Sequence, residues 1–306
     1  MTEIAEFVFG ASYKTFLAAL AIAATASALY FILTGRTPER RFYAGTAAFT
    51  LVLFAAYIAF LLMAPPDAAS DQKSVVYLRQ EPDSRSLIVF LHGWRGDATT
   101  WRQLAELAQQ DPDLTQANIV IINYVTHMAR NNLPINDLAD WIGVHLARIA
   151  GNRNVYIVAH SLGGVAGRQL LVHNHNSGSP VRIRLLVSIA SPFQGANSAR
   201  LATLLGLYPG LLETLVPGSR YLRSLAADWA RYRDARAPEA ARHLCIAAGN
   251  DDVVIRESAI ADCDSRPIVY PAWGHQDAII PSTSSDERYI IPIKLVATAL
   301  KHDEAR

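Results

Sequence analysis

The residues Asn154–Ala159 read NVYIVA, and His160-Ser161-Leu162-Gly163-Gly164 follows them directly. The six-residue run is rich in β-branched and aliphatic side chains and lacks strict alternation with polar residues. Such a run is typical of a strand covered on both faces, as in a parallel sheet. The chain contains five similar runs: Ser86–Leu91, Ala117–Tyr124, Ile183–Ala190, Leu244–Ala248 and Pro267–Tyr270.

Helical patterns lie between several of these runs. They span Thr99–Gln110, Ile135–Ile149, Val165–His173 and Glu287–Lys301. Strands that alternate with helices predict an α/β domain with a mostly parallel sheet flanked by helices.

The segment after Asn154–Ala159 has the pattern of a nucleophile elbow, a sharp turn that carries a nucleophilic serine from a strand into a helix. Ser161 occupies the nucleophile position, with the small residues Ala159 and Gly163 two positions before and after it. The backbone N–H of Leu162 would then point at a developing oxyanion. The alternative is an ordinary glycine-rich turn in which Ser161 caps a helix.

Further candidate residues follow other predicted strands. Gly93 and Trp94 come after Ser86–Leu91, and the N–H of Trp94 is the candidate second donor of an oxyanion hole. Asp251 follows Leu244–Ala248, and His275 lies five residues beyond Tyr270. We expect His275 to act as general base and Asp251 to orient it, with Asp252 as the alternative acid. Taken alone, the Gly93 segment fits an ordinary glycine turn, the two aspartates fit a solvated turn, and His275 fits a surface histidine.

The remaining histidines and the composition exclude other classes of site. His160 is adjacent to the nucleophile and cannot reach it as a base, while His173 and His175 fit a polar helix end. No spacing indicates a metal site, and we expect no metal and no cofactor. With 28 basic and 27 acidic side chains, the chain has no basic excess with which to bind nucleic acid.

The mean hydropathy is slightly positive, at +0.14, because apolar residues concentrate near the N-terminus. Residues 16–33 and 42–64 are two uncharged runs. As helices they would reach about 27 and 34 Å, against a hydrocarbon core of about 30 Å. They predict a transmembrane hairpin within residues 1–71, ahead of a domain at 72–306. Two buried core helices, or a signal peptide in the first run, are the alternatives.

The loop between the two runs contains Arg36, Arg40 and Arg41. Positively charged loops stay in the cytoplasm, so this loop places the domain on the opposite side. For a bacterial inner membrane, to which the arginine-rich and lysine-poor composition points, that side is the periplasm. Cys245 and Cys263 could form a disulfide there, although two separate thiols are equally compatible with the sequence.

Residues 196–241 form an insertion between two predicted strands, and it is too long for a bare loop. Its first half is rich in leucine: Leu201, Leu204, Leu205, Leu207, Leu211, Leu212 and Leu215. In its second half Leu222, Leu225, Trp229 and Tyr232 follow helical spacing. The insertion is either a cap packed on the domain or a lid that lines an acyl pocket and touches the bilayer.

These motifs together resemble the α/β-hydrolases, in particular lipases and serine esterases related to GPI inositol-deacylases. The resemblance covers about residues 75–300. It includes Ser191-Pro192-Phe193-Gln194-Gly195, Val216–Leu222, and the stretch from Gly274 through Pro281 to Tyr289. Ala159 departs from the usual glycine at the first elbow position. The resemblance implies cleavage of an ester or thioester through an acyl-enzyme on Ser161, without a cofactor.

The sequence therefore predicts a membrane-anchored serine hydrolase that acts on carboxylic esters of lipids or other hydrophobic acyl compounds. There are two alternatives to this function. One is an acyltransferase or thioesterase with the same triad, and the other is a non-catalytic, membrane-tethered binding module. Protein partners, acyl chain length and head group are not indicated by the sequence.

Overall fold

The chain divides into two compact units, Met1–Asp71 and Gln72–Arg306. The computed structural model describes residues 49, 75–124, 126, 133–204 (with no side chains for 201–204), 210–237 and 240–305. The predicted hairpin helices at 16–33 and 42–64 lie outside these residues, apart from Phe49. Within the described stretches, no helix combines the length and the apolar character that crossing a bilayer requires.

The second unit is built on a seven-stranded sheet with the order β1-β3-β2-β4-β5-β6-β7. The strands are β1 (Val75–Arg79), β2 (Ser86–Leu91), β3 (Ala117–Ile122), β4 (Asn154–His160), β5 (Arg182–Ile189), β6 (Arg242–Ala248) and β7 (Ile268–Tyr270). All neighbouring pairs are parallel except β1 and β3. The prediction of a mostly parallel sheet flanked by helices is confirmed.

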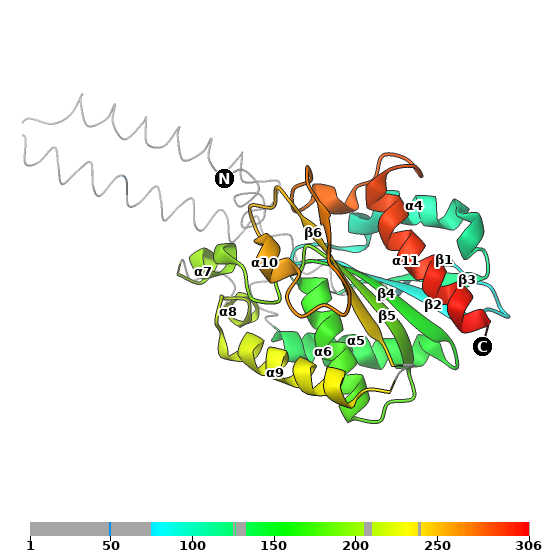
Figure 1. Cartoon of the computed structure of the whole chain (residues 1–306), viewed down its shortest axis with the longest axis horizontal. Helices are drawn as coiled ribbons and strands as arrows, with labels where there is room; N and C mark the ends of the chain where they lie inside the picture. The colour runs from blue at the N-terminus through cyan, green and yellow to red at the C-terminus, as the bar shows by residue number, and fades with distance from the viewer. Residues whose placement is uncertain are drawn as a thin grey trace, which may run out of the picture. The chain divides into compact units, whose positions relative to one another are not determined.

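Helices connect the strands on both sides of the sheet. They are α4 (Arg102–Gln110), α5 (Ile135–Ala150), α6 (Leu162–Asn176), α7 (Asn197–Leu204), α8 (Leu211–Thr214), α9 (Arg220–Ala235), α10 (Arg256–Ala259) and α11 (Glu287–Glu304), with short 3-10 turns η2 (Ala98–Trp101), η3 (Pro112–Leu114) and η4 (Asp277–Ile279). Figure 1 shows α4 and α11 on one face of the sheet and α5, α6 and α9 on the other.

The six predicted strands are present with small shifts at their ends. The edge strand β1 was not predicted, because its five residues are mostly half-buried and show no continuous apolar core pattern. Helix α6 begins at Leu162, three residues earlier than the predicted Val165, because the chain turns directly from β4 into the helix. This early start places the first turn of α6 at the carboxyl edge of the sheet.

The insertion is helical in its described part. Helix α9 buries Leu222, Leu225, Trp229 and Tyr232, so the predicted apolar face of this helix is confirmed. Leu211, Leu212 and Leu215 are also buried. These leucines pack inside the domain, which fits a cap, while Leu205 and Leu207 lie outside the described residues.

Candidate active site

Ser161 occupies a sharp turn between β4 and α6. Its backbone has φ +52° and ψ −124°, a conformation that residues other than glycine rarely adopt. The turn is held by the Ser161 N–H, which donates to the Ile189 carbonyl on the neighbouring strand at 2.9 Å. The residue is buried, with 2% exposure. This geometry is that of a nucleophile elbow.

Small residues around the elbow let several backbones approach one another. A Cβ on Gly163 would lie 2.5 Å from the His92 carbonyl oxygen, and one on Gly164 would lie 2.0 Å from Ser191 Oγ. Ala159 is fully buried, so its extra methyl group fits. Glycine is thus required sterically at 163 and 164, while position 159 tolerates alanine.

His275 and Asp251 complete a chain of hydrogen bonds from Ser161. His275 Nε2 lies 3.0 Å from Ser161 Oγ, and His275 Nδ1 lies 2.8 Å from Asp251 Oδ2. Both side chains are almost completely buried, with exposures of 0% and 1%. The three residues follow β4, β6 and β7, at the carboxyl ends of parallel strands, where such sheets gather functional groups.

Residues 249–261, called the acid loop below, follow β6 and fix the Asp251 carboxylate. Its Oδ1 accepts the backbone N–H groups of Val253 and Val254 at 2.8 and 2.7 Å. Asp252 is exposed instead. Of the two acids that the sequence left open, the structure brings Asp251 to His275.

The segments that carry the two candidate oxyanion donors both lie next to the serine. A Cβ on Gly93 would be 3.0 Å from Ser161 Cβ, so the loop that carries Trp94 lies directly against the elbow. Trp94 is buried. Leu162 is the first residue of α6, and N–H groups in a first helical turn have no intrahelical acceptor. The structure thus brings both segments to the nucleophile.

The loop that carries Trp94 is held by residues just after β3, and the sequence did not predict these contacts. His92 Nε2 accepts the Tyr124 backbone N–H at 3.2 Å, and the Tyr124 hydroxyl donates to the His92 carbonyl. Their rings stack with centroids 3.9 Å apart. Thr126 Oγ1 accepts the Arg95 N–H at 2.8 Å. Because these partners are about 30 residues apart, no local sequence pattern indicates them.

His160 acts next to the triad rather than in it. Its Nε2–H donates to the His275 backbone carbonyl at 3.0 Å, so the ring supports the loop that carries His275. Burial, followed by the charge of His275, holds the pKa of His160 well below its usual value of 6.5. The ring is therefore neutral. His173 Nδ1 contacts the Asp140 carboxylate, and the His175 ring contacts Tyr232 edge-on.

A second buried polar cluster connects the elbow helix with the acid loop. Arg168 on α6 is 2% exposed, and its Nη2 donates to the Ala261 carbonyl at 2.6 Å. Its guanidinium lies 3.5 Å from the Phe193 ring centroid. His243 Nδ1 accepts the Arg168 Nε–H at 3.3 Å, and His243 Nε2 lies 2.8 Å from Ser188 Oγ. Burial lowers the pKa of Arg168 to about 9 and keeps the pKa of His243 well below 6.5.

The same region contains the two cysteines and the cap helix. Cys245 on β6 and Cys263, just beyond the acid loop, form a disulfide with a Cα–Cα distance of 6.0 Å. Trp229 of α9 donates its indole N–H to the Asp262 carbonyl at 2.8 Å. The pairing that the sequence left open is therefore present. Across the described stretches, no group of three or more His, Cys, Asp or Glu side chains could hold a metal ion.

Comparison with known proteins agrees with this fold. Residues 88–299 match the model of the alpha/beta hydrolase family, which is more than half of the chain. The chain therefore belongs to the alpha/beta hydrolase family. No curated protein sequence matches it significantly.

Several solved structures share the fold at low sequence identity. The mature lipase BlEst2 of Bacillus licheniformis superposes with a TM-score of 0.52 at 17% identity, covering 72% of this chain and 96% of the lipase. A monoacylglycerol lipase of Paleococcus ferrophilus gives 0.51 at 13%, covering 74% and 98%. A carboxylesterase structure from the thaumarchaeon Nitrososphaera gargenis gives 0.50 at 15%, covering 78% and 99%.

Proposed function

We propose that this chain is a membrane-anchored serine hydrolase that cleaves carboxylic esters of hydrophobic acyl groups. The observation that carries the proposal is the continuous hydrogen-bonded chain from Ser161 through His275 to Asp251. A strained serine at a strand-to-helix turn, with a histidine and an acid behind it, is the arrangement that activates a serine hydroxyl as a nucleophile.

In the first half-reaction, Ser161 Oγ attacks the ester carbonyl carbon while His275 Nε2 takes the hydroxyl proton. Asp251 holds the imidazole by its Nδ1–H and stabilises the cation that forms. The carbonyl oxygen becomes an oxyanion, and the N–H groups of Trp94 and Leu162 are the proposed donors to it. When the intermediate collapses, the ester C–O bond breaks and the leaving alcohol takes the proton from His275.

In the second half-reaction, water replaces the alcohol. His275 accepts a proton from the water as the water oxygen attacks the acyl-enzyme carbonyl carbon. The second tetrahedral intermediate expels Ser161 Oγ, which recovers the proton from His275. The products are the free carboxylic acid and the regenerated enzyme, and no cofactor takes part.

The activity is tested with a fluorophosphonate probe on the full-length chain. Wild type should be labelled, and Ser161→Ala should not be. Ser177→Ala, at an exposed serine at the opposite end of α6 from Ser161, is the control that should keep full labelling. Unlabelled wild type, or undiminished labelling of Ser161→Ala, would contradict the proposal.

The membrane anchor and an extracytoplasmic domain are part of the proposal. Support comes from the two uncharged runs at 16–33 and 42–64 and from the arginines of the loop between them. The Cys245–Cys263 disulfide adds to this, because disulfides persist in oxidising compartments such as the periplasm. Reporter fusions after residue 38 and at the C-terminus should report cytoplasm and periplasm, respectively, and the reverse pattern would overturn the topology.

A hydrophobic substrate is proposed from the leucine-rich first half of the insertion, acting as a lid. Leu211, Leu212 and Leu215 are buried, so the lid test must spare them. Replacing residues 205–209 by a Gly-Ser linker of equal length should reduce kcat/KM for p-nitrophenyl octanoate far more than for the acetate ester. Equal losses on both esters would contradict a lid, and the inositol-deacylase resemblance stays a prediction.

A further inference from the structure

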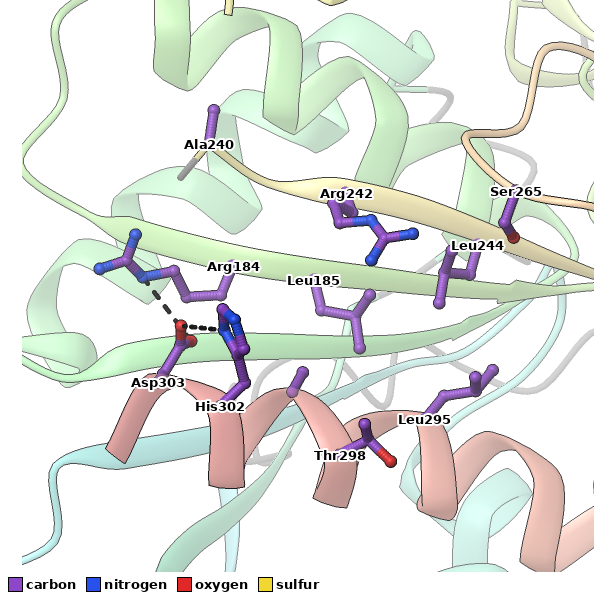
Figure 2. A pocket seen from close by; sticks show the side chains of 11 residues that line it. Arg184, Leu185, Ala240, Arg242, Leu244, Ser265, Leu295, Thr298, His302 and Asp303 are labelled. Atoms are coloured by element: carbon purple, nitrogen blue, oxygen red, sulfur yellow. Dashed lines mark ion pairs between the residues drawn. The ribbon is translucent and has the colours of Figure 1, made fainter. Parts of the chain in front are cut away.

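A cavity lies between the sheet and α11, away from the triad. It has a volume of about 400 Å³ and opens near the amino ends of β5 and β6 (Figure 2). Ser161, Asp251 and His275 all follow the carboxyl ends of strands. Five residue steps lead from Arg184 to Ile189 at the end of β5. At about 3.3 Å per step, they separate the two sites by roughly 17 Å along the sheet. The cavity volume falls within the range of small-ligand sites.

The first notable feature of this cavity is a charged residue, Arg242, in line with a row of apolar side chains on β6. Leu244, Ile246 and Ala248 alternate along β6 and face the core shared with α11. Arg242 begins the same row, and it pairs with Leu185 of β5. Among the residues that the structure describes, no ion pair or hydrogen bond is made by the Arg242 side chain. Arg242 itself is exposed, so it places a solvent-accessible cation at the amino end of an otherwise buried apolar row.

A β-bulge adds a second arginine. Ile183 and Leu185 oppose the consecutive residues Val155 and Tyr156 of β4, so Arg184 is the extra residue between them. Bulges re-aim side chains and are common beside functional sites. As a result, the neighbours Arg184 and Leu185 both line the cavity.

The only acidic side chain among the cavity-lining residues is already neutralised. Asp303 accepts the Tyr156 hydroxyl at 2.7 Å and lies 3.8 Å from Arg184. Figure 2 shows this pair at one end of the cavity and Arg242 on the strand above it, with Leu185, Leu244 and Leu295 nearby. The charge of Arg184 is thus offset by Asp303, whereas no described side chain offsets the charge of Arg242.

We propose that this cavity binds a small amphiphilic carboxylate, with its anionic head on Arg242 and its apolar chain against Leu185, Leu244 and Leu295. Guanidinium groups recognise carboxylates by paired, charge-assisted hydrogen bonds. The leucines supply the apolar wall that such a chain needs. That this carboxylate is of the class released by ester cleavage rests on the proposed function, but the binding site itself does not.

The test is calorimetric titration of hexanoate into the full-length chain in nanodiscs, with empty nanodiscs as the blank. Hexanamide has nearly the same shape without the charge, and it should bind at least about tenfold more weakly. Arg242→Gln should weaken hexanoate binding by about tenfold or more. Arg148→Gln, at an exposed arginine on α5 outside the cavity, is the matched control and should bind like wild type.

Two further measurements separate this site from others. Thr298→Trp, at an exposed position on α11 that lines the cavity, should block hexanoate by filling the space. Sulfate should bind at least tenfold more weakly than hexanoate, because it has no apolar chain. Equal hexanoate affinity of wild type and Arg242→Gln, equal binding of hexanamide, or equal binding of sulfate would overturn the proposal.

The outcome is independent of the catalytic test. Arg242 lies at the opposite end of the strand from the acid loop, so Arg242→Gln should label with fluorophosphonate like wild type. Failure of labelling in wild type would overturn the proposed hydrolase, whereas unchanged hexanoate affinity in Arg242→Gln would overturn the cavity site. Thermal unfolding of each variant confirms that it is folded.

Discussion

At β5 and β6, the two faces of the sheet differ in the side chains that they present. Towards α4 and α11, the strands present apolar rows such as Ile88 and Phe90 on β2 and Val187 and Ile189 on β5. Towards α6 and α9, strands β5 and β6 present Ser188, His243 and Cys245, which lie around the buried Arg168. Apolar burial is non-directional, whereas hydrogen bonds fix particular atoms at particular distances. The difference indicates that one face mainly stabilises the domain and the other mainly aligns the elbow with the acid loop.

The largest expected effect concerns the triad, towards which the polar face is organised. Asp251→Asn should lower kcat/KM by about 10³–10⁴-fold, because the neutral amide cannot stabilise the histidine cation or select its tautomer. The melting temperature should change little, since the amide keeps an acceptor for the Val253 and Val254 N–H groups. Asp252→Asn is the neighbouring control, and a loss of similar size there would refute the assignment of Asp251.

On the apolar face, stability rather than activity should respond. Phe90 is fully buried and its ring centroid lies 5.1 Å from that of Trp101. Phe90→Ala should lower the free energy of unfolding by about 3–5 kcal/mol, measured by urea denaturation. The folded fraction should keep kcat/KM within about twofold of wild type. A tenfold loss of kcat/KM would show that this face also aligns the site.

On the polar face, Arg168→Met tests alignment directly. The substitution preserves much of the volume but leaves the Ala261 carbonyl without its donor, which costs about 1–3 kcal/mol of stability. If the cluster positions the acid loop, kcat should also fall by about tenfold while KM changes little. Arg168→Lys should recover part of kcat, because the ammonium can still donate to Ala261. A stability loss with unchanged kcat would mean that the cluster only supports the fold.

The last expected effect is a dependence of stability on pH. Burial keeps the pKa of His243 and His160 well below 6.5 in the folded chain. The unfolded chain binds these protons as the pH falls below about 6.5, and the folded chain does not. Stability is therefore fully present above that pH and should decrease below it, by about 1.4 kcal/mol per pH unit for each histidine. His243→Asn should have a shallower slope between pH 6.5 and 5, and an unchanged slope would argue against a neutral His243.

The local pattern was sufficient for the sheet and for the elbow. Continuous apolar runs predicted six strands, and the small residues around Ser161 predicted the turn, because both depend on the side chains within a few residues. The edge strand β1 was missed, since a half-buried edge shows no apolar run. Likewise, the contacts of His92 with Tyr124 and of Arg168 with Ala261 join residues far apart in the chain, where no short pattern can reveal them.

By itself, the sequence determined which residue types stand at the carboxyl ends of the strands: Ser161, the pair Asp251 and Asp252, and His275. Only the tertiary structure decided between the two acids, because the acid loop turns Asp251 towards His275 and leaves Asp252 exposed. It likewise decided that Cys245 and Cys263 are paired and that Arg184 and Arg242 share a cavity. The physical reason is the same in each case: residue chemistry is local, whereas the distance between two side chains depends on how the whole sheet and its loops pack.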